Sequence, residues 1–224
     1  EAVPVATASV ITVTANGLGT DLRNTGQSVT VIDREEIETV QGADPARALN
    51  RVPGLSLSRS GGVGRVTSVN LRGASSDQLL VLIDGVRVAD QASPAGGFDF
   101  GNLLLGTAGK IDVLRGSNST IWGSEAVGGV IDVSTRTERG MSGSVEFGAR
   151  DTLFASAAAG AGNDAVFFGL TGSWYETDGF SAAASGTEAD GAQQFALGTT
   201  AFVNLTPSLE LFAHGNFAEG EVEI

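Results

Sequence analysis

The chain has 224 residues, with 13 Lys or Arg against 26 Asp or Glu, so its formal net charge is −13. This acidic balance argues against nucleic-acid binding, which needs a basic face to meet the phosphates. The chain has no Cys and one histidine, His214, which excludes disulfides, thiol catalysis, Cys-based zinc sites and His clusters.

Charge divides the chain into two parts. All the Lys and Arg residues lie at or before Arg150, whereas residues 151–224 hold ten acidic residues and no Lys or Arg. Such a shift in composition predicts two architectural units that meet near residues 137–143. We expect a flexible segment at residues 1–27, a first folded unit at 28–140 and a second unit at 141–224.

The first 27 residues are small and polar, apart from a β-prone patch at residues 10–14. A patch of this kind near a terminus forms an edge strand or pairs with the strand edge of a partner protein. The sequence leaves both outcomes open.

The following residues predict a short strand and two short helices. Asp33 precedes Glu36 by three positions, as in a capping box, and therefore predicts a helix start. Asp44-Pro45 predicts the start of a second helix, because Asp caps the free amides and Pro suits the first helical position. Pro53-Gly54 ends that helix.

The next segment predicts a strand, two loops and a hairpin. Residues 55–57 alternate as a strand and lead into a Gly-rich loop at 59–65, and residues 69–73 predict a polar loop. Asp84-Gly85 lies between the two β-prone runs of residues 79–88, which is the strongest short-range signal for a β-hairpin.

The first unit closes with a Gly/Ala/Ser loop at residues 89–101 and strands at 110–116 and 128–134. These elements together predict a small α+β domain. No enzyme motif fits it, because residues 61–64 lack the G-x-G-x-x-G spacing and Gly109-Lys110 lacks the rest of a phosphate loop.

Three titratable residues are expected to have structural rather than catalytic roles. Asp112 and Asp132 lie within strands, where a structural or surface role is more common than acid–base work. His214 is expected on a polar face. We therefore expect no catalysis.

Hydrophobic alternation with a period of two dominates the second unit. It runs through residues 145–149, 166–175, 195–203 and 209–217, and more weakly through 153–161. Runs of about nine to twelve residues match tilted strands that cross a bilayer in an outer-membrane barrel. A soluble β-meander is the alternative, since its strands alternate too.

The connections between these runs also favour a barrel. Short turns at residues 162–164 and 205–208 contrast with a long polar loop at 177–192, and Trp174 and Tyr175 suit an aromatic girdle at the membrane interface. The second unit holds about five strands, whereas a closed barrel needs about eight or more. We therefore expect the chain to be an N-terminal piece of a longer protein.

Several blocks resemble the TonB-dependent outer-membrane transporters. Residues 49–55, 71–73 and 82–86 are similar to plug blocks of that family and occur in the same order. The family's plug signature is matched by Arg115-Gly116, Trp122-Gly123-Ser124 and Ala126-Val127-Gly128-Gly129-Val130. The N-terminal TonB box, which pairs with the TonB protein, resembles Ile11, Thr12, Val13, Thr14 and Ala15.

The resemblance implies an α+β plug domain followed by the first antiparallel strands of a transmembrane β-barrel in the bacterial outer membrane. The implied partners are the TonB protein, the lipid bilayer and a metal chelate, with no nucleic acid, and the barrel is expected to be monomeric. It further implies a plug that fills the lumen, with its arginines facing an acidic barrel wall. No enzymatic step and no required cofactor are implied.

Within the family the chain is most similar to the cobalamin transporters, through residues 13–15, 61–64 and 79–88. The resemblance implies that two plug loops touch cobalamin: Ser58, Arg59, Ser60, Gly61, Gly62, Val63, Gly64 and Arg65 in the first, and Val88, Ala89, Asp90, Gln91, Ala92, Ser93, Gly96, Gly97 and Asp99 in the second. Glu188 and Asp190 resemble part of that subgroup's calcium-binding set, although Ser181 stands where an Asp is expected.

Two further functions stay open on the sequence. The chain could belong to a ferric siderophore receptor, because the plug signature is shared across substrate classes. It could also be a non-transporting binding or signalling module of the plug type. The number of alternating strands encoded after residue 224 separates this module from a transporter.

Overall fold

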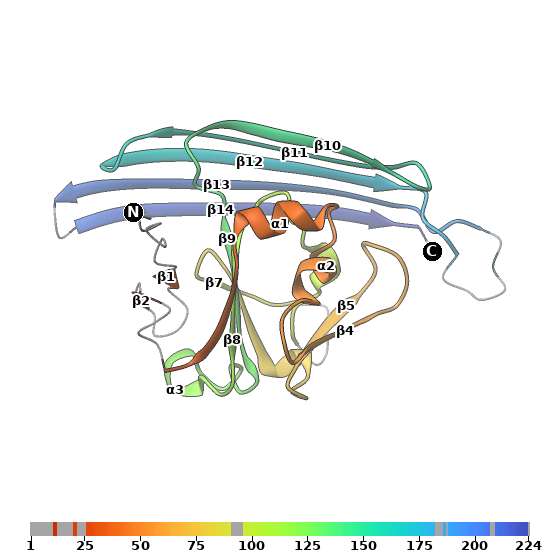
Figure 1. Cartoon of the computed structure of the whole chain (residues 1–224), viewed down its shortest axis with the longest axis horizontal. Coiled ribbons are helices and arrows are strands. Elements are labelled where there is room, and N and C mark those ends of the chain that lie inside the picture. The colour runs from red at the N-terminus through yellow and green to blue at the C-terminus, as the bar shows by residue number, and fades with distance from the viewer. Residues whose placement is uncertain are drawn as a thin grey trace, which may run out of the picture.

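The computed structural model describes residues 11–12, 20–21, 26–90, 96–181, 186, 188–206 and 209–223. Figure 1 shows a broad sheet of long strands that passes over a smaller unit of short strands and helices. We refer to the smaller part, from β1 to β9, as the first unit and to the broad sheet, β10 to β14, as the second unit.

The elements follow in chain order. The first unit contains β1 (Ile11–Thr12), β2 (Thr20–Asp21), β3 (Ser28–Ile32), α1 (Arg34–Val40), α2 (Pro45–Leu49), β4 (Leu55–Arg59), β5 (Thr67–Leu71), the 3-10 turn η2 (Ser76–Gln78), β6 (Leu79–Ile83), β7 (Val86–Val88), the 3-10 turn η3 (Phe100–Asn102), β8 (Ala108–Arg115), α3 (Ser119–Trp122) and β9 (Gly129–Thr135). The second unit contains β10 (Gly140–Gly148), β11 (Thr152–Gly162), β12 (Val166–Thr177), β13 (Ala192–Thr206) and β14 (Leu209–Val222).

Both predicted helix starts are confirmed. The Asp33 carboxylate accepts a hydrogen bond from the backbone amide of Glu36 at 2.9 Å, and Asp44 accepts one from Ala46 at 2.9 Å. Each side chain therefore satisfies an amide that has no partner within its helix. No helix in the described part of the chain is long and apolar enough to cross a membrane.

The sheet of the first unit has the order β3-β8-β9-β6-β7, in which only β6 and β9 pair in parallel. Strand β6 is apolar at every position because both faces of this sheet are covered. Leu79 and Val81 pack into the main core with α1 and α2, whereas Leu80 and Leu82 pack into a second cluster beside Trp122 of α3.

The predicted hairpin forms between β6 and β7. Asp84 and Gly85 have φ values of 51° and 77°, so both occupy the left-handed region that a two-residue hairpin turn requires. The predicted polar loop at residues 69–73 is wrong. Val69 and Leu71 lie in β5, which pairs with β4, and both are 0% exposed. The prediction failed because polar residues alternate with these two, which is also the pattern of a half-buried strand with a period of two.

The second unit is an antiparallel meander in which each strand pairs with the next. In β12, Phe167 and Thr171 face the first unit and are buried, whereas Phe168 and Leu170 point outward and are exposed. The outer face is apolar, which is the pattern of strands in a transmembrane β-barrel, whereas the inner face combines small and polar residues with the aromatic residues Phe154, Phe167 and Tyr175. Large exposed side chains on this face include Val145, Phe147, Val166, Phe168, Leu170, Trp174, Leu197, Leu211 and Phe217.

One aromatic residue departs from the predicted girdle. Trp174 does face outward, where its ring lies 6.3 Å from that of Phe195. Tyr175 is 6% exposed and packs inward against Ala43 and Leu104 of the first unit. Adjacent residues of a strand point to opposite faces, so these two cannot both meet the lipid.

The predicted contact between arginines and an acidic wall is largely wrong. Within the first unit, arginines pair with acids of the same unit, as in Arg34 with Glu38, Arg51 with Glu36, Arg59 with Asp44 and Arg87 with Glu125. Two arginines do reach acids of the second unit: Arg65 pairs with Asp190, and Arg139, just before β10, pairs with Asp164. The uneven charge distribution thus reflects pairing inside the first unit more than pairing across the interface.

Candidate functional site

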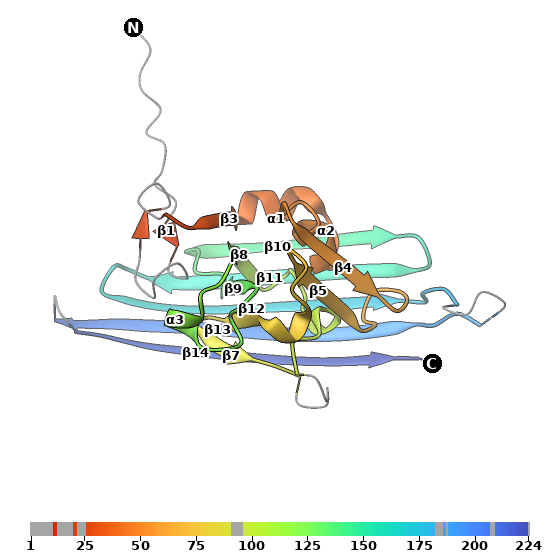
Figure 2. The same cartoon turned by 90° about the horizontal axis from the view of Figure 1, so that it is seen from below.

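The two predicted functional segments lie toward opposite ends of the molecule. In both views the β4–β5 loop lies near the β12–β13 connection and the end of β14, whereas β1 and β2 lie toward the other end (Figures 1 and 2). Ile11 and Thr12 form β1 and pair with β2. Val13, Thr14 and Ala15 lie outside the described residues.

The base of the β4–β5 loop is fixed by an ion pair between Arg59 and Asp44. The guanidinium donates from Nη1 and Nη2 to the two carboxylate oxygens at 2.8 and 2.5 Å, and from Nε to Thr67 Oγ1 at 2.9 Å. The side chains are only 19% and 11% exposed. The hydrogen bond with Asp44 raises the pKa of Arg59 above its ordinary value, so this charge is permanent.

Asp99 joins the two predicted ligand loops. Its Oδ1 accepts hydrogen bonds from the backbone amides of Thr67, at the end of the first loop, and Gly101, each at 2.8 Å. A Cβ on Gly101 would lie 2.3 Å from the Arg65 carbonyl oxygen, so this close approach requires glycine. The structure brings Arg59, Arg65 and Asp99 together, and all three hold the loops in place.

The second predicted loop is closed at its base by a hydrogen bond from the Asp90 amide to the Gly97 carbonyl at 2.7 Å. Gly96 and Gly97 both have positive φ values, 75° and 91°. The predicted positions Gln91, Ala92 and Ser93 lie outside the described residues.

A cavity of about 350 Å³ lies between the tip of the β4–β5 loop and the second unit. Gly62 and Val63 line it from the loop, and Tyr175, Phe180 and Arg150 line it from the strands and their connections. The Arg150 guanidinium lies 5.0 Å from the centre of the Phe180 ring. This wall combines aromatic faces with charge at the end of the molecule where the predicted ligand loops lie.

Comparison with known proteins identifies this arrangement. Residues 21–130 match the TonB-dependent receptor plug domain. The chain belongs to the TonB-dependent receptors. Its first unit is the plug, and its second unit consists of barrel strands.

Relatives and solved structures agree with this assignment. The chain is 37% identical over 182 residues to the vitamin B12 transporter BtuB of Vibrio vulnificus, an alignment that covers 79% of this chain and 29% of that protein. It is 35% identical over 164 residues to BtuB of Photobacterium profundum, covering 73% and 25%. The chain therefore spans less than a third of the length of these relatives. They are transporters rather than enzymes.

Solved structures show the same fold at low sequence identity. The outer-membrane ferripyoverdine receptor of Pseudomonas aeruginosa superposes with a TM-score of 0.72 at 17% identity, over 94% of this chain and 27% of that one. The siderophore receptor PiuA of Acinetobacter baumannii gives 0.71 at 20% identity, over 90% and 27%. At these identities the likeness establishes the fold alone.

The predicted calcium residues lie at the same end as the ligand loops. In the described residues, no three His, Cys, Asp or Glu side chains gather closely enough to hold a metal ion. One carboxylate oxygen of Asp190 instead lies 3.3 Å from Arg65 Nη2. Calcium binding at Glu188 and Asp190 is therefore a prediction that the contacts among the described residues leave untested.

The sequence missed a polar contact between the plug and the barrel strands. The Asp84 side chain, in the β6–β7 turn, accepts hydrogen bonds from the Thr135 amide at 2.7 Å and from Asn216 Nδ2 of β14 at 2.9 Å. His214 Nδ1 lies 3.8 Å from the same carboxylate. Asp84-Gly85 signalled a turn, but nothing in the sequence indicated what the Asp side chain would meet.

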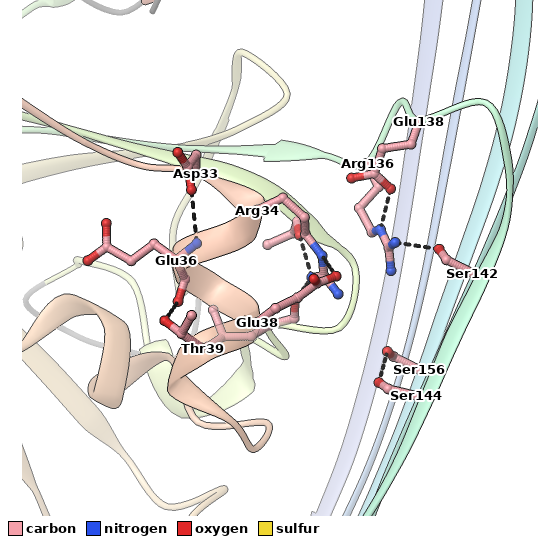
Figure 3. Close-up of polar contacts among 12 residues, drawn as sticks. Asp33, Arg34, Glu36, Glu38, Thr39, Arg136, Glu138, Ser142, Ser144 and Ser156 are labelled. Carbon is pink, nitrogen blue, oxygen red and sulfur yellow. Dashed lines mark hydrogen bonds and ion pairs between the residues drawn. The ribbon is translucent and has the colours of Figure 1, made fainter. Parts of the chain in front are cut away.

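A second cavity, of about 300 Å³, separates α1 from the barrel strands. In Figure 3, Arg34 and Glu38 extend from α1 toward the strands, and Arg136, Ser142, Ser144 and Ser156 lie on the far side. Arg136 is buried, and it bonds to Glu138 at 2.8 Å and to Ser142 at 2.5 Å. A cavity of this size with polar groups in its lining has room for ordered water.

Proposed function

We propose that this chain is the plug and first barrel strands of a receptor that imports cobalamin across the bacterial outer membrane. The observation that carries the proposal is the identity of 35–37%, over most of this chain, with proteins named vitamin B12 transporters. The siderophore receptors among the solved structures are more distant, at 16–20% identity.

The ligand would bind at the plug loops 58–65 and 88–99. Glycines at the tip of the first loop leave the backbone accessible, so a large, rigid ligand can approach it closely. The neighbouring cavity offers the aromatic rings of Tyr175 and Phe180. Arg59 and Asp99 would hold these loops in place through the hydrogen bonds described above, without touching the ligand.

Energy would come from the TonB protein. Ile11, Thr12, Val13, Thr14 and Ala15 would be captured by strand addition, which gives affinity through main-chain hydrogen bonds. Pulling on this segment would remodel the plug and open a path through the barrel. The proposal needs no catalytic step and no resident cofactor. Calcium binding at Glu188 and Asp190 stays a prediction.

Replacing Val13 by proline is expected to abolish cobalamin uptake and to leave cobalamin binding unchanged. Proline lacks an amide hydrogen and cannot donate to a strand ladder, so strand addition to TonB fails while the ligand loops are untouched. The measurement is uptake of labelled cyanocobalamin by cells that carry the full-length gene product as their only cobalamin receptor. Binding is measured on the same cells.

Ala6→Pro is the matched control, because it puts the same residue in the same segment outside the predicted box. It should transport normally. Normal uptake by the Val13→Pro variant would contradict the role of this segment. Binding of a ferric siderophore in place of cobalamin would move the substrate to an iron chelate, and binding without uptake in the wild type would favour a non-transporting module.

A further inference from the structure

Arg65, at the end of the ligand loop, makes polar contacts with the second unit. Its Nη2 lies 3.3 Å from the Asp190 carboxylate and donates a hydrogen bond to the Glu223 carbonyl oxygen. The Arg65 and Asp190 side chains are 18% and 12% exposed. A charge pair this sheltered is screened less than an exposed one.

The backbone next to Arg65 is docked against the same strands. Gly64 has a φ of 88°, and a Cβ at this position would lie 3.3 Å from both Ala192 and Val222. The Arg65 carbonyl accepts a hydrogen bond from Thr67 Oγ1 at 2.8 Å. The loop therefore meets the start of β13 at Ala192, the end of β14 at Val222 and the β12–β13 connection at Asp190.

We propose that Arg65 is a positioning residue that fastens the ligand loop of the plug to the barrel before any ligand arrives. Its Nη2 makes both contacts, with the Asp190 carboxylate and with the Glu223 carbonyl oxygen, so the end of the side chain lies against the second unit. The inference rests on the proposed function only in treating residues 58–65 as the ligand loop.

Fastening matters because a free loop must be ordered when it binds. A residue that the barrel already fixes has lost its conformational freedom before the ligand binds. The entropy cost of ordering the loop on binding is then smaller, and the affinity is higher. The fastening also links ligand binding to the β12–β13 connection, where Asp190 lies.

The first test uses the full-length gene product without ligand. Amide hydrogen exchange of residues 60–66 is measured in the wild type, Arg65→Met, Arg65→Lys and Asp190→Asn. We expect exchange to accelerate about tenfold to a hundredfold in Arg65→Met, which keeps the length of the side chain and loses its charge. Arg65→Lys should recover part of the protection.

Arg51→Met is the matched control. Arg51 lies 3.6 Å from Glu36 in an exposed pair, so its removal should leave exchange at residues 60–66 unchanged. Wild-type protection in the Arg65→Met variant would overturn the proposal. This experiment needs no ligand, so it stands even if cobalamin does not bind.

The second test separates positioning from direct contact. Dissociation constants for cyanocobalamin are measured for Arg65→Met, Asp190→Asn and the double variant. If Arg65 acts through Asp190, each single change weakens binding and the double variant is no worse than Arg65→Met alone. If Asp190→Asn leaves affinity intact while Arg65→Met lowers it, Arg65 touches the ligand and the proposal fails. A wild type that binds no cobalamin refutes the proposed function and leaves the exchange test to decide this inference.

Discussion

Replacing Asp44 by alanine should lower the free energy of unfolding of the plug by about 3 kcal/mol. The change removes the N-cap of α2, which contributes about 1 kcal/mol. It also leaves the half-buried guanidinium of Arg59 without its bidentate partner, and breaking a sheltered ion pair by removing one member costs more than the pair contributes. With side-chain exposures of 19% and 11%, this pair is largely sheltered from solvent.

The measurement is native-state hydrogen exchange of the amides in α2 and β4 of the full-length gene product. A loss of about 3 kcal/mol corresponds to exchange about a hundredfold faster. Asp44→Asn separates the two roles, because asparagine caps a helix as well as aspartate does but carries no charge. It should show an intermediate effect. Equal exchange in Asp44→Ala and the wild type would contradict the role assigned to this pair.

Replacing Gly106 by alanine should unseat the plug from the barrel strands. A Cβ at position 106 would lie 2.5 Å from the Ser173 Cβ and 2.9 Å from the Ser156 Cβ. Both distances are far below van der Waals contact, so one of the two surfaces has to move. Overpacking of this kind costs about 1–3 kcal/mol.

Protease cleavage of the plug during a urea titration measures this effect, because only an unseated or unfolded plug is cut. The midpoint should fall in Gly106→Ala and stay unchanged in Gly26→Ala, where an added Cβ meets nothing within 4 Å. Ser173→Gly removes the nearest obstacle, so the double variant should regain part of the loss. An unchanged midpoint in Gly106→Ala would show that the plug does not rest on β11 and β12 at this point.

Local signals predicted the parts of the fold that depend on neighbouring residues. Asp33 and Asp44 cap their helices as predicted, and Asp84-Gly85 makes the predicted turn, since capping and turn chemistry act over two or three residues. The period of two in the second unit predicted its strands for the same reason.

Contacts between distant segments could not be predicted in this way. The strand at Val69 and Leu71 is defined by its pairing with β4, and Tyr175 faces the plug because of its place on the inner face of β12. The polar residues of the 69–73 segment made the strand look like a loop. The aromatic pair Trp174-Tyr175 suggested that both rings face the lipid. Composition showed that the arginines gather in the plug, but only the fold shows that their partners lie there too.

In the candidate site, too, the sequence indicated segments but not the contacts between distant residues. Resemblance indicated the two ligand loops, and the structure shows how Asp44, Arg59 and Asp99 fix them. Asp44 was predicted only as a helix cap, because the residue that it pairs with lies 15 positions further along the chain. No sequence pattern marks such a pair.

Equilibrium binding of cyanocobalamin to the full-length gene product in detergent, with and without calcium, tests the central claim most directly. We predict saturable binding with a submicromolar dissociation constant. If Glu188 and Asp190 bind calcium, affinity falls when calcium is removed and the loss disappears in the Asp190→Asn variant. The absence of saturable cobalamin binding in both conditions would contradict the proposed substrate.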